Sequence, residues 1–156
     1  MSKRIKIALV GNPNCGKTTL FNKLTGLNQK VGNFPGVTVE KRSGLCTMAD
    51  GQKYEIIDLP GSYSLSSTSP DEKVVQDILL DTNNASFPDV VILIADVTNL
   101  KRNLFLVTQI IDLGFPVIVA LNMSDVAKKK KILKNVEQRL SREQRIKKAQ
   151  NMEGTL

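Results

Sequence analysis

A stretch near the N-terminus has the residue types and spacing of a phosphate-binding loop. Residues 11–18 read G-N-P-N-C-G-K-T and match the pattern G-x-x-x-x-G-K-[S/T] in full. Two glycines at this spacing allow consecutive backbone N–H groups to point at phosphate oxygens at the start of a helix. We expect Lys17 to reach the outer phosphates and the hydroxyl of Thr18 to bind magnesium. The other expected nucleotide-binding residues of this phosphate loop are Asn12, Pro13, Asn14, Cys15, Gly16 and Thr19.

A second motif, Asp58-Leu59-Pro60-Gly61, follows the apolar run at residues 54–57. A carboxylate at the end of a strand beside a phosphate loop suits support of a bound magnesium ion. The backbone N–H of Gly61 is expected to meet a terminal phosphate. Asp-x-x-Gly alone is also common in ordinary turns that end a strand. Its position after a phosphate loop favours the functional interpretation.

A third motif, Asn122-Met123-Ser124-Asp125, ends the apolar run at residues 117–121. In open α/β sheets the ligand binds at the carboxyl ends of the strands, which is where this base loop (residues 122–125) falls. An aspartate there accepts hydrogen bonds from N1–H and the exocyclic amine of guanine, a pattern that adenine does not offer. The alternative is a polar loop after a strand. The motif favours a guanine nucleotide over an adenine nucleotide.

Residues 31–40, V-G-N-F-P-G-V-T-V-E, lie between the first two motifs, and we call them the switch segment. Two glycines and a proline suit a segment that is either ordered or released by a ligand. We expect Thr38 to close on magnesium through its hydroxyl and on the terminal phosphate through its N–H, with Gly36 and Val37 beside the nucleotide. Such a sequence by itself is an ordinary loop. The other three motifs favour a switch.

These motifs require elements that bring them to one edge of a sheet. Nearly continuous apolar runs, typical of strands covered on both faces, occur at residues 5–10, 54–57, 90–95 and 117–121. Helical patterns lie between them, at residues 18–25, after the predicted N-cap Ser69 and at residues 103–113. The alternation predicts an α/β fold with a mostly parallel central sheet and helices on both faces.

One antiparallel edge strand is expected in that sheet. Residues 39–46 have strand character, and the Asp50-Gly51 pair predicts a hairpin that joins them to the run at residues 54–57. At the other end, the predicted domains are a nucleotide-binding domain at residues 1–128 and a basic helical tail at residues 129–156. We expect a last strand after Asp125 to be missing or atypical. The strand at residues 117–121 would then be an exposed edge and a site for self-association.

Composition excludes several classes of function. The 156 residues include no histidine, which excludes histidine triads and histidine metal sites, and two cysteines, which favour a reducing compartment. Residues 1–125 carry as many basic as acidic side chains, so the whole net charge of +7 lies in residues 126–156. A neutral body with 4% aromatic residues argues against nucleic-acid binding. No apolar run is long enough to span a membrane, so we expect a soluble intracellular domain.

In their order along the chain, the phosphate loop, the switch segment, the Asp58–Gly61 motif and the base loop resemble a small GTPase of the Ras-like P-loop superclass. They resemble in particular the cytosolic G domain of ferrous iron transport protein B. The resemblance covers residues 3–128, and its most specific parts are the switch segment and D-L-P-G-S-Y-S-L. It implies a magnesium-dependent GTPase in which Lys17 and the loop amides hold the phosphates. Thr18 and Thr38 would then bind magnesium with support from Asp58, while Asn122, Met123 and Asp125 contact guanine.

The same resemblance implies a catalytic set, a second cation and a partner. Lys17, Thr38, Gly61 and Asn14 form the implied catalytic set. Asn14 stands where related GTPases have an asparagine that helps to bind a potassium ion, which acts in place of an arginine finger. In that family the domain precedes a membrane region that carries iron(II). The implied partner is this region, and the implied location is the cytoplasmic face of the inner membrane.

Three departures from common GTPases bear on activity. Ser62 follows Gly61 where Ras-type enzymes place a water-orienting glutamine, which predicts slow basal hydrolysis of about 10⁻⁴ to 10⁻² s⁻¹. Met123 replaces the lysine of the commoner N-K-x-D, which predicts modest base affinity. Cys15 at a helix N-terminus beside Lys17 has two interpretations: an acidified thiol open to alkylation, or an inert small residue.

Two other functions remain open on the sequence alone. One is an RNA- or ribosome-associated assembly GTPase, which uses the same motifs and often has a basic surface. The other is a nucleotide-binding switch that barely hydrolyses GTP, or an incomplete fragment with no function alone. The basic tail has an apolar stripe that suits a helix packed on the sheet, and the alternative is contact with an acidic partner or an anionic membrane surface.

Overall fold

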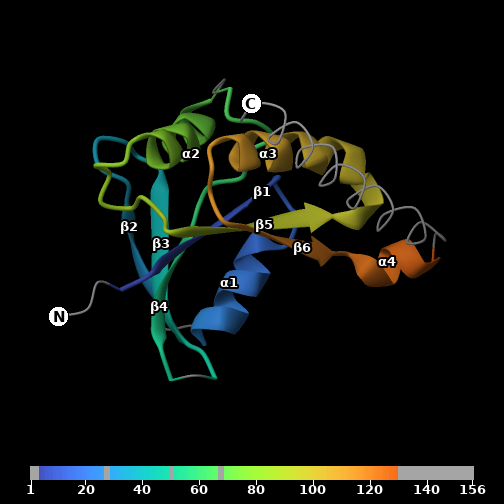
Figure 1. Cartoon of the computed structure of the whole chain (residues 1–156), viewed down its shortest axis with the longest axis horizontal. Coiled ribbons are helices and arrows are strands. Elements are labelled where there is room, and N and C mark those ends of the chain that lie inside the picture. The colour runs from blue at the N-terminus through green and yellow to red at the C-terminus, as the bar shows by residue number, and fades with distance from the viewer. Residues whose placement is uncertain (1–3, 27–28, 50, 67–68, 130–156) are drawn as a thin grey trace, which may run out of the picture.

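The computed structural model describes residues 4–26, 29–49, 51–66 and 69–129 and shows one mixed six-stranded sheet with helices on both faces (Figure 1). The strands lie in the order β2-β3-β4-β1-β5-β6. Their bounds are β1 Lys6–Gly11, β2 Gln29–Asn33, β3 Glu40–Thr47, β4 Lys53–Asp58, β5 Val90–Asp96 and β6 Val117–Asn122. The predicted α/β class and all four predicted parallel strands are confirmed.

The four parallel strands β4, β1, β5 and β6 form the centre and one side of the sheet. Their continuous apolar runs arise because both faces are covered. In β1, Ala8 and Val10 face one group of buried side chains while Ile7 and Leu9 face the other. The carboxyl ends of these strands carry Gly11, Asp58, Asp96 and Asn122 to the same edge. This edge is therefore where the predicted motifs converge.

The antiparallel side of the sheet contains one strand that sequence analysis missed. The predicted strand is confirmed as β3, which pairs antiparallel with β4 in the register Ser43 to Ile57. The first three residues of the predicted switch segment, 31–33, are not loop but part of β2, which pairs antiparallel with β3. Its sequence, QKVGN, is mostly polar and leaves Val31 61% exposed, so no apolar pattern marks it. Pairing with β3 makes it a strand.

The helices on the two faces of the sheet pack against two different groups of buried strand side chains. Helix α1 (Lys17–Thr25) covers one face and buries Phe21, while α2 (Pro70–Leu80) and α3 (Leu100–Asp112) cover the other (Figure 1). The Ser69 hydroxyl accepts a hydrogen bond from the Glu72 N–H at 3.2 Å, which confirms the predicted cap. A short helical turn, η1 (Val97–Asn99), precedes α3 and was not predicted, and α4 (Ser124–Lys129) follows β6.

In the described part of the chain, β6 has a neighbour on one side only, and Ile118 is 57% exposed. Self-association through this edge stays a prediction. The predicted tail lies almost wholly outside the described residues, and the proposed domain division stays a prediction with it. Among the described helices none is long and apolar enough to cross a membrane.

Candidate nucleotide-binding site

The phosphate loop needs glycine at both of its glycine positions, Gly11 and Gly16. Strand β1 ends at Gly11 and α1 begins at Lys17, as the motif requires. Gly16 has a φ of 93°, which favours glycine, and a Cβ atom added at Gly11 would lie 2.5 Å from the carbonyl oxygen of Ile94. Asn14 has a φ of 62°, a left-handed conformation that asparagine adopts more readily than most residues with a side chain. These positions therefore suit the residue types that the motif places there.

Lys17, Thr18 and Asp58 come together beneath this loop. Lys17 is 9% and Asp58 8% exposed, and the Thr18 hydroxyl donates a hydrogen bond to Asp58 Oδ2 at 3.2 Å. Burial raises the pKa of the Asp58 carboxyl, and the nearby Lys17 ammonium and the Thr18 hydrogen bond oppose that shift. The other carboxylate oxygen, Asp58 Oδ1, is buried and accepts no hydrogen bond.

That unpartnered oxygen tests whether a magnesium ion fits these residues. A buried polar atom without a partner is costly, and such atoms in native structures usually have a functional reason. Magnesium prefers hard oxygen ligands, and a carboxylate and a threonine hydroxyl beside a phosphate loop supply them. The residues present therefore fit the ion: Thr18 would hold it directly, and Asp58 would orient and support it.

Gly61 lies directly against the phosphate loop. A Cβ atom added there would be 3.0 Å from three atoms of Pro13, and the Ser62 N–H donates to the Gly11 carbonyl at 3.1 Å. The backbone of the second motif therefore packs against Pro13 of the phosphate loop so closely that a side chain at position 61 would crowd the proline. The Ser62 hydroxyl donates to the Ser64 carbonyl at 2.6 Å, so it is engaged within its own loop.

The base loop is joined to the phosphate loop by one side chain. Asn122 Nδ2 donates to the Cys15 carbonyl at 2.8 Å, and a Cβ atom added at Gly16 would lie 2.1 Å from the same nitrogen. Met123 has a φ of 60°, which turns the chain sharply into α4. Asp125 lies in the first turn of α4 and is exposed, as a residue that reads a base must be.

The switch-segment threonine lies at the surface of the described structure. Phe34 is buried among the side chains of the α2 face, and the N–H of Val37 donates to its carbonyl at 3.3 Å. Thr38 and Gly36 are exposed, and no hydrogen bond in the described residues joins Thr38 to Thr18 or Asp58. The predicted magnesium contact of Thr38 stays a prediction.

The interpretation of Cys15 as an acidified thiol is wrong. The side chain is 2% exposed, and burial raises its pKa more than the neighbouring Lys17 ammonium and backbone hydrogen bonds lower it. The thiol packs against the backbone of Gly11, since a Cβ atom added at Gly11 would lie 2.7 Å from Cys15 Sγ. The structure favours the alternative of an inert small residue.

Sequence reasoning missed a polar network beside the base loop. Asp96 ends β5 opposite Asn122 in the β5–β6 register, and Asn103 is buried on α3 with its amide bonded to the start of that helix. A signal was available: residues 96–99 read D-V-T-N directly after a buried strand, at the same sheet edge as the other motifs.

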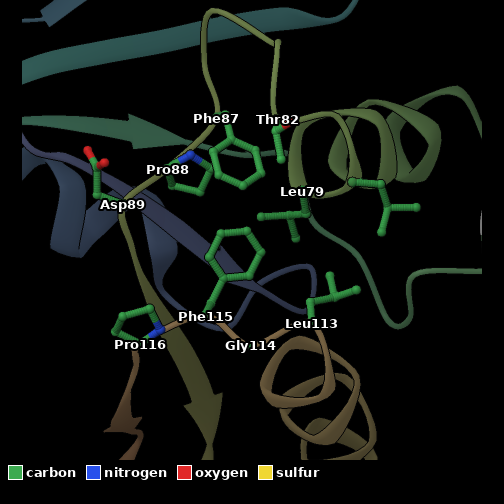
Figure 2. Close-up of a pocket in the computed structure, with 10 residues that line it drawn as sticks. Leu79, Thr82, Phe87, Pro88, Asp89, Leu113, Gly114, Phe115 and Pro116 are labelled. Atoms are coloured by element: carbon green, nitrogen blue, oxygen red, sulfur yellow. The ribbon is translucent and has the colours of Figure 1, made fainter.

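A pocket of about 420 Å³ lies at the amino ends of β5 and β6, away from the carboxyl ends that carry the motifs. Figure 2 shows the ring of Phe87 beside the ring of Phe115, with Leu79 and Leu113 on one side of the pair. The two ring centroids lie 5.3 Å apart. None of the predicted nucleotide-binding residues lines it. The nucleotide site and this apolar pocket are separate features.

A phosphate loop, a carboxylate motif and a base loop gathered at the carboxyl edge of this sheet define a G domain of the P-loop class. Comparison with known proteins is specific within that class. Residues 5–150 match the family described as ferrous iron transport protein B. The chain belongs to this family.

Curated relatives and solved structures agree with the family. The chain is 51% identical over 130 residues to Fe(2+) transporter FeoB of Leptospira biflexa, with 83% of this chain and 18% of the relative covered. It is 49% identical over 126 residues to a Fe(2+) transport protein A/FeoB fusion protein of Porphyromonas gingivalis, with 81% and 14% covered. The chain thus spans less than a fifth of the length of these relatives.

Among solved structures, the G domain of the T. maritima FeoB iron transporter superposes with a TM-score of 0.75 at 44% identity. That match covers 86% of this chain and 84% of the other. A mutant of S. thermophilus NFeoB bound to mGDP superposes with a TM-score of 0.74 at 51% identity, covering 83% of this chain and 47% of the other.

Proposed function

We propose that this chain binds guanine nucleotides with magnesium and hydrolyses GTP slowly to GDP and phosphate, as a regulatory cytosolic domain of a ferrous iron transporter. The observation that carries the proposal is the cluster of Lys17, Thr18 and Asp58 with its unpartnered buried carboxylate oxygen. The mGDP- and GDP-bound states of related FeoB domains support the ligand class.

The residues divide the work of binding. The backbone N–H groups of residues 14–19 and the Lys17 ammonium hold the phosphates, with Asn12 and Pro13 shaping the start of the loop, while Asp125 accepts from the base and Met123 covers it. Thr38, with Gly36 and Val37, completes the site beside magnesium and the terminal phosphate. When bound, magnesium neutralises charge on the outer phosphates.

Hydrolysis on this scaffold is slow because the residue after Gly61 is Ser62 and not a water-orienting glutamine. The Ser62 hydroxyl is bonded to Ser64, so it does not replace the glutamine of Ras-type enzymes. We propose a basal rate of about 10⁻⁴ to 10⁻² s⁻¹. A steady-state rate well above 1 s⁻¹ in sodium buffer would contradict it.

Potassium is proposed as an activator through Asn14. This residue is exposed at the mouth of the phosphate loop in a left-handed backbone conformation. Single-turnover hydrolysis should be faster in potassium than in sodium, and Asn14→Ala should remove the difference while leaving GDP affinity within a few fold. Equal rates in the two salts for the wild-type chain would exclude the role.

The first test is a titration with fluorescent GDP and ADP analogues in magnesium and potassium, with Lys17→Ala as control. Micromolar or tighter binding of the guanine analogue alone supports the proposal, and failure to bind either analogue contradicts it for this chain. The role in transport, with the membrane region as partner at the cytoplasmic face of the inner membrane, is tested by iron uptake through the longer transporter carrying Lys17→Ala.

A further inference from the structure

The base loop is attached to the rest of the domain through one small element. Helix α4, which begins two residues after Asn122 and carries Asp125 in its first turn, contacts η1 more than any other described element. Ala127 of α4 is fully buried in the same group of apolar side chains as Val97 of η1. The orientation of α4, and of Asp125 with it, therefore depends on where η1 lies.

The position of η1 depends in turn on Asn103. This side chain is 2% exposed and lies on α3, one turn after η1. Its Nδ2 donates to the Asn99 carbonyl at 2.8 Å and to the Asp96 carbonyl at 3.5 Å, while its Oδ1 accepts from the Asp96 N–H at 3.4 Å. One amide thus binds backbone groups at both ends of the turn.

Asp96 and Thr98 close the turn from the other side. Asp96 Oδ1 accepts from the Thr98 N–H at 2.8 Å and from the Thr98 hydroxyl at 2.7 Å. Asp96 also stands opposite Asn122 in the β5–β6 register. The network therefore reaches the base loop by two routes, through the strand pair and through the packing of α4 on η1.

We infer that Asn103 is a positioning residue for guanine recognition: through η1 and α4 it holds Asp125 where its carboxylate meets N1–H and the 2-amino group of the base together. This inference rests on the proposed function. Two hydrogen bonds to one base edge require a fixed carboxylate, whereas the phosphate contacts come from a loop that Asn103 does not touch. Loss of Asn103 affects base discrimination more than phosphate binding.

The test compares GDP with IDP, whose base lacks the 2-amino group, and with ADP. The wild-type chain should prefer GDP to IDP by about tenfold, the value of one hydrogen bond to a charged acceptor. Asn103→Ala should weaken GDP binding by about tenfold and IDP binding by about twofold, so that the preference falls by roughly fivefold. Thr98→Val should reduce the preference in the same direction, and Thr98→Ser should restore it.

The matched control is Thr108→Ala on the same helix, because its hydroxyl bonds to the Phe105 carbonyl away from η1. This variant should keep the wild-type preference. An unchanged GDP to IDP ratio in Asn103→Ala and Thr98→Val overturns the inference, even if overall affinity or melting temperature falls. A wild-type chain that binds neither nucleotide instead counts against the proposed function.

A second measurement needs no nucleotide. The Ala127 N–H donates to the Met123 carbonyl at 3.0 Å in the first turn of α4. Hydrogen exchange of this amide should speed up by at least about tenfold in Asn103→Ala relative to Thr108→Ala, with the amides of α1 unchanged. Equal exchange at Ala127 in the two variants would show that Asn103 does not hold α4 and would overturn the inference on its own.

Discussion

Asn122 Nδ2 lies 2.8 Å from the carbonyl oxygen of Cys15, and this bond joins residues 107 positions apart. The Asn122 side chain at the end of β6 thereby bonds to the backbone of the phosphate loop. Gly16 has no Cβ atom, and the place that such an atom would take is filled by the Asn122 amide. The phosphate loop and the base loop form one connected unit before any nucleotide binds.

Asn122→Ala should therefore weaken binding at both ends of the nucleotide. The Cys15 carbonyl would lose its partner, which costs about 1–3 kcal/mol for a buried acceptor, and GDP affinity should fall by about tenfold or more. Isothermal titration with GDP and with inorganic pyrophosphate distinguishes the two effects. Pyrophosphate affinity should fall in Asn122→Ala but not in Asp125→Ala. An unchanged pyrophosphate affinity in Asn122→Ala would show that the bond does not organise the phosphate loop.

Asp58→Asn should stabilise the nucleotide-free chain while it impairs function. Burial of a carboxylate with one unpartnered oxygen is costly, and burial raises the pKa of this group. A neutral amide of the same shape removes that cost, so the free energy of unfolding should rise by about 1 kcal/mol. Magnesium-dependent GDP binding should weaken in the same variant. Urea denaturation without nucleotide checks the first effect, and a drop in stability would contradict it.

The segment after Gly61 should be docked on α3 by a cation–π contact. The Arg102 guanidinium lies 3.8 Å from the centroid of the Tyr63 ring, and the Leu65 N–H donates to Gln109 Oε1 at 2.9 Å. A double-mutant cycle of Arg102→Ala and Tyr63→Ala should give a coupling energy of about 0.5–1 kcal/mol, since Arg102 is exposed. The cycle with Lys101→Ala in place of Arg102→Ala is the control and should give none. Coupling near zero in the first cycle would exclude the contact.

Cys15 should resist alkylation in the folded chain. Its thiol is buried and its pKa is raised, so little thiolate is exposed near neutral pH. Iodoacetamide should label it at least about tenfold more slowly than it labels the same chain in denaturant, and GDP should change the rate little. Peptide mapping by mass spectrometry separates Cys15 from Cys46. Rapid labelling that GDP blocks would restore the interpretation rejected above.

Much of the fold follows from local patterns. Continuous apolar runs predicted the parallel strands because strands covered on both faces have no polar side, and Ser69 with Pro70 predicted the start of α2. The prediction failed for β2 and η1. Neither has an apolar pattern of its own, since β2 forms by pairing with β3 and η1 by hydrogen bonds to Asn103. Elements that depend on pairing or on one side chain from a neighbouring element lack the apolar periodicity that predicted the other strands and helices.

The sequence by itself indicated a nucleotide site of the P-loop class. Each of its signals, the spacing of Gly11, Gly16 and Lys17 and the short motifs that contain Asp58 and Asp125, lies within a few consecutive positions. Only the tertiary structure decided how those groups meet. The order of strands in the sheet brings Asn122 to Cys15 and Gly61 to Pro13. Burial, which depends on all neighbours at once, decided that the pKa of the Cys15 thiol is raised and that Asp58 keeps an unpartnered oxygen. The spacing of neighbouring residues can be read from the sequence, whereas contacts between residues far apart in the sequence depend on how the whole fold packs.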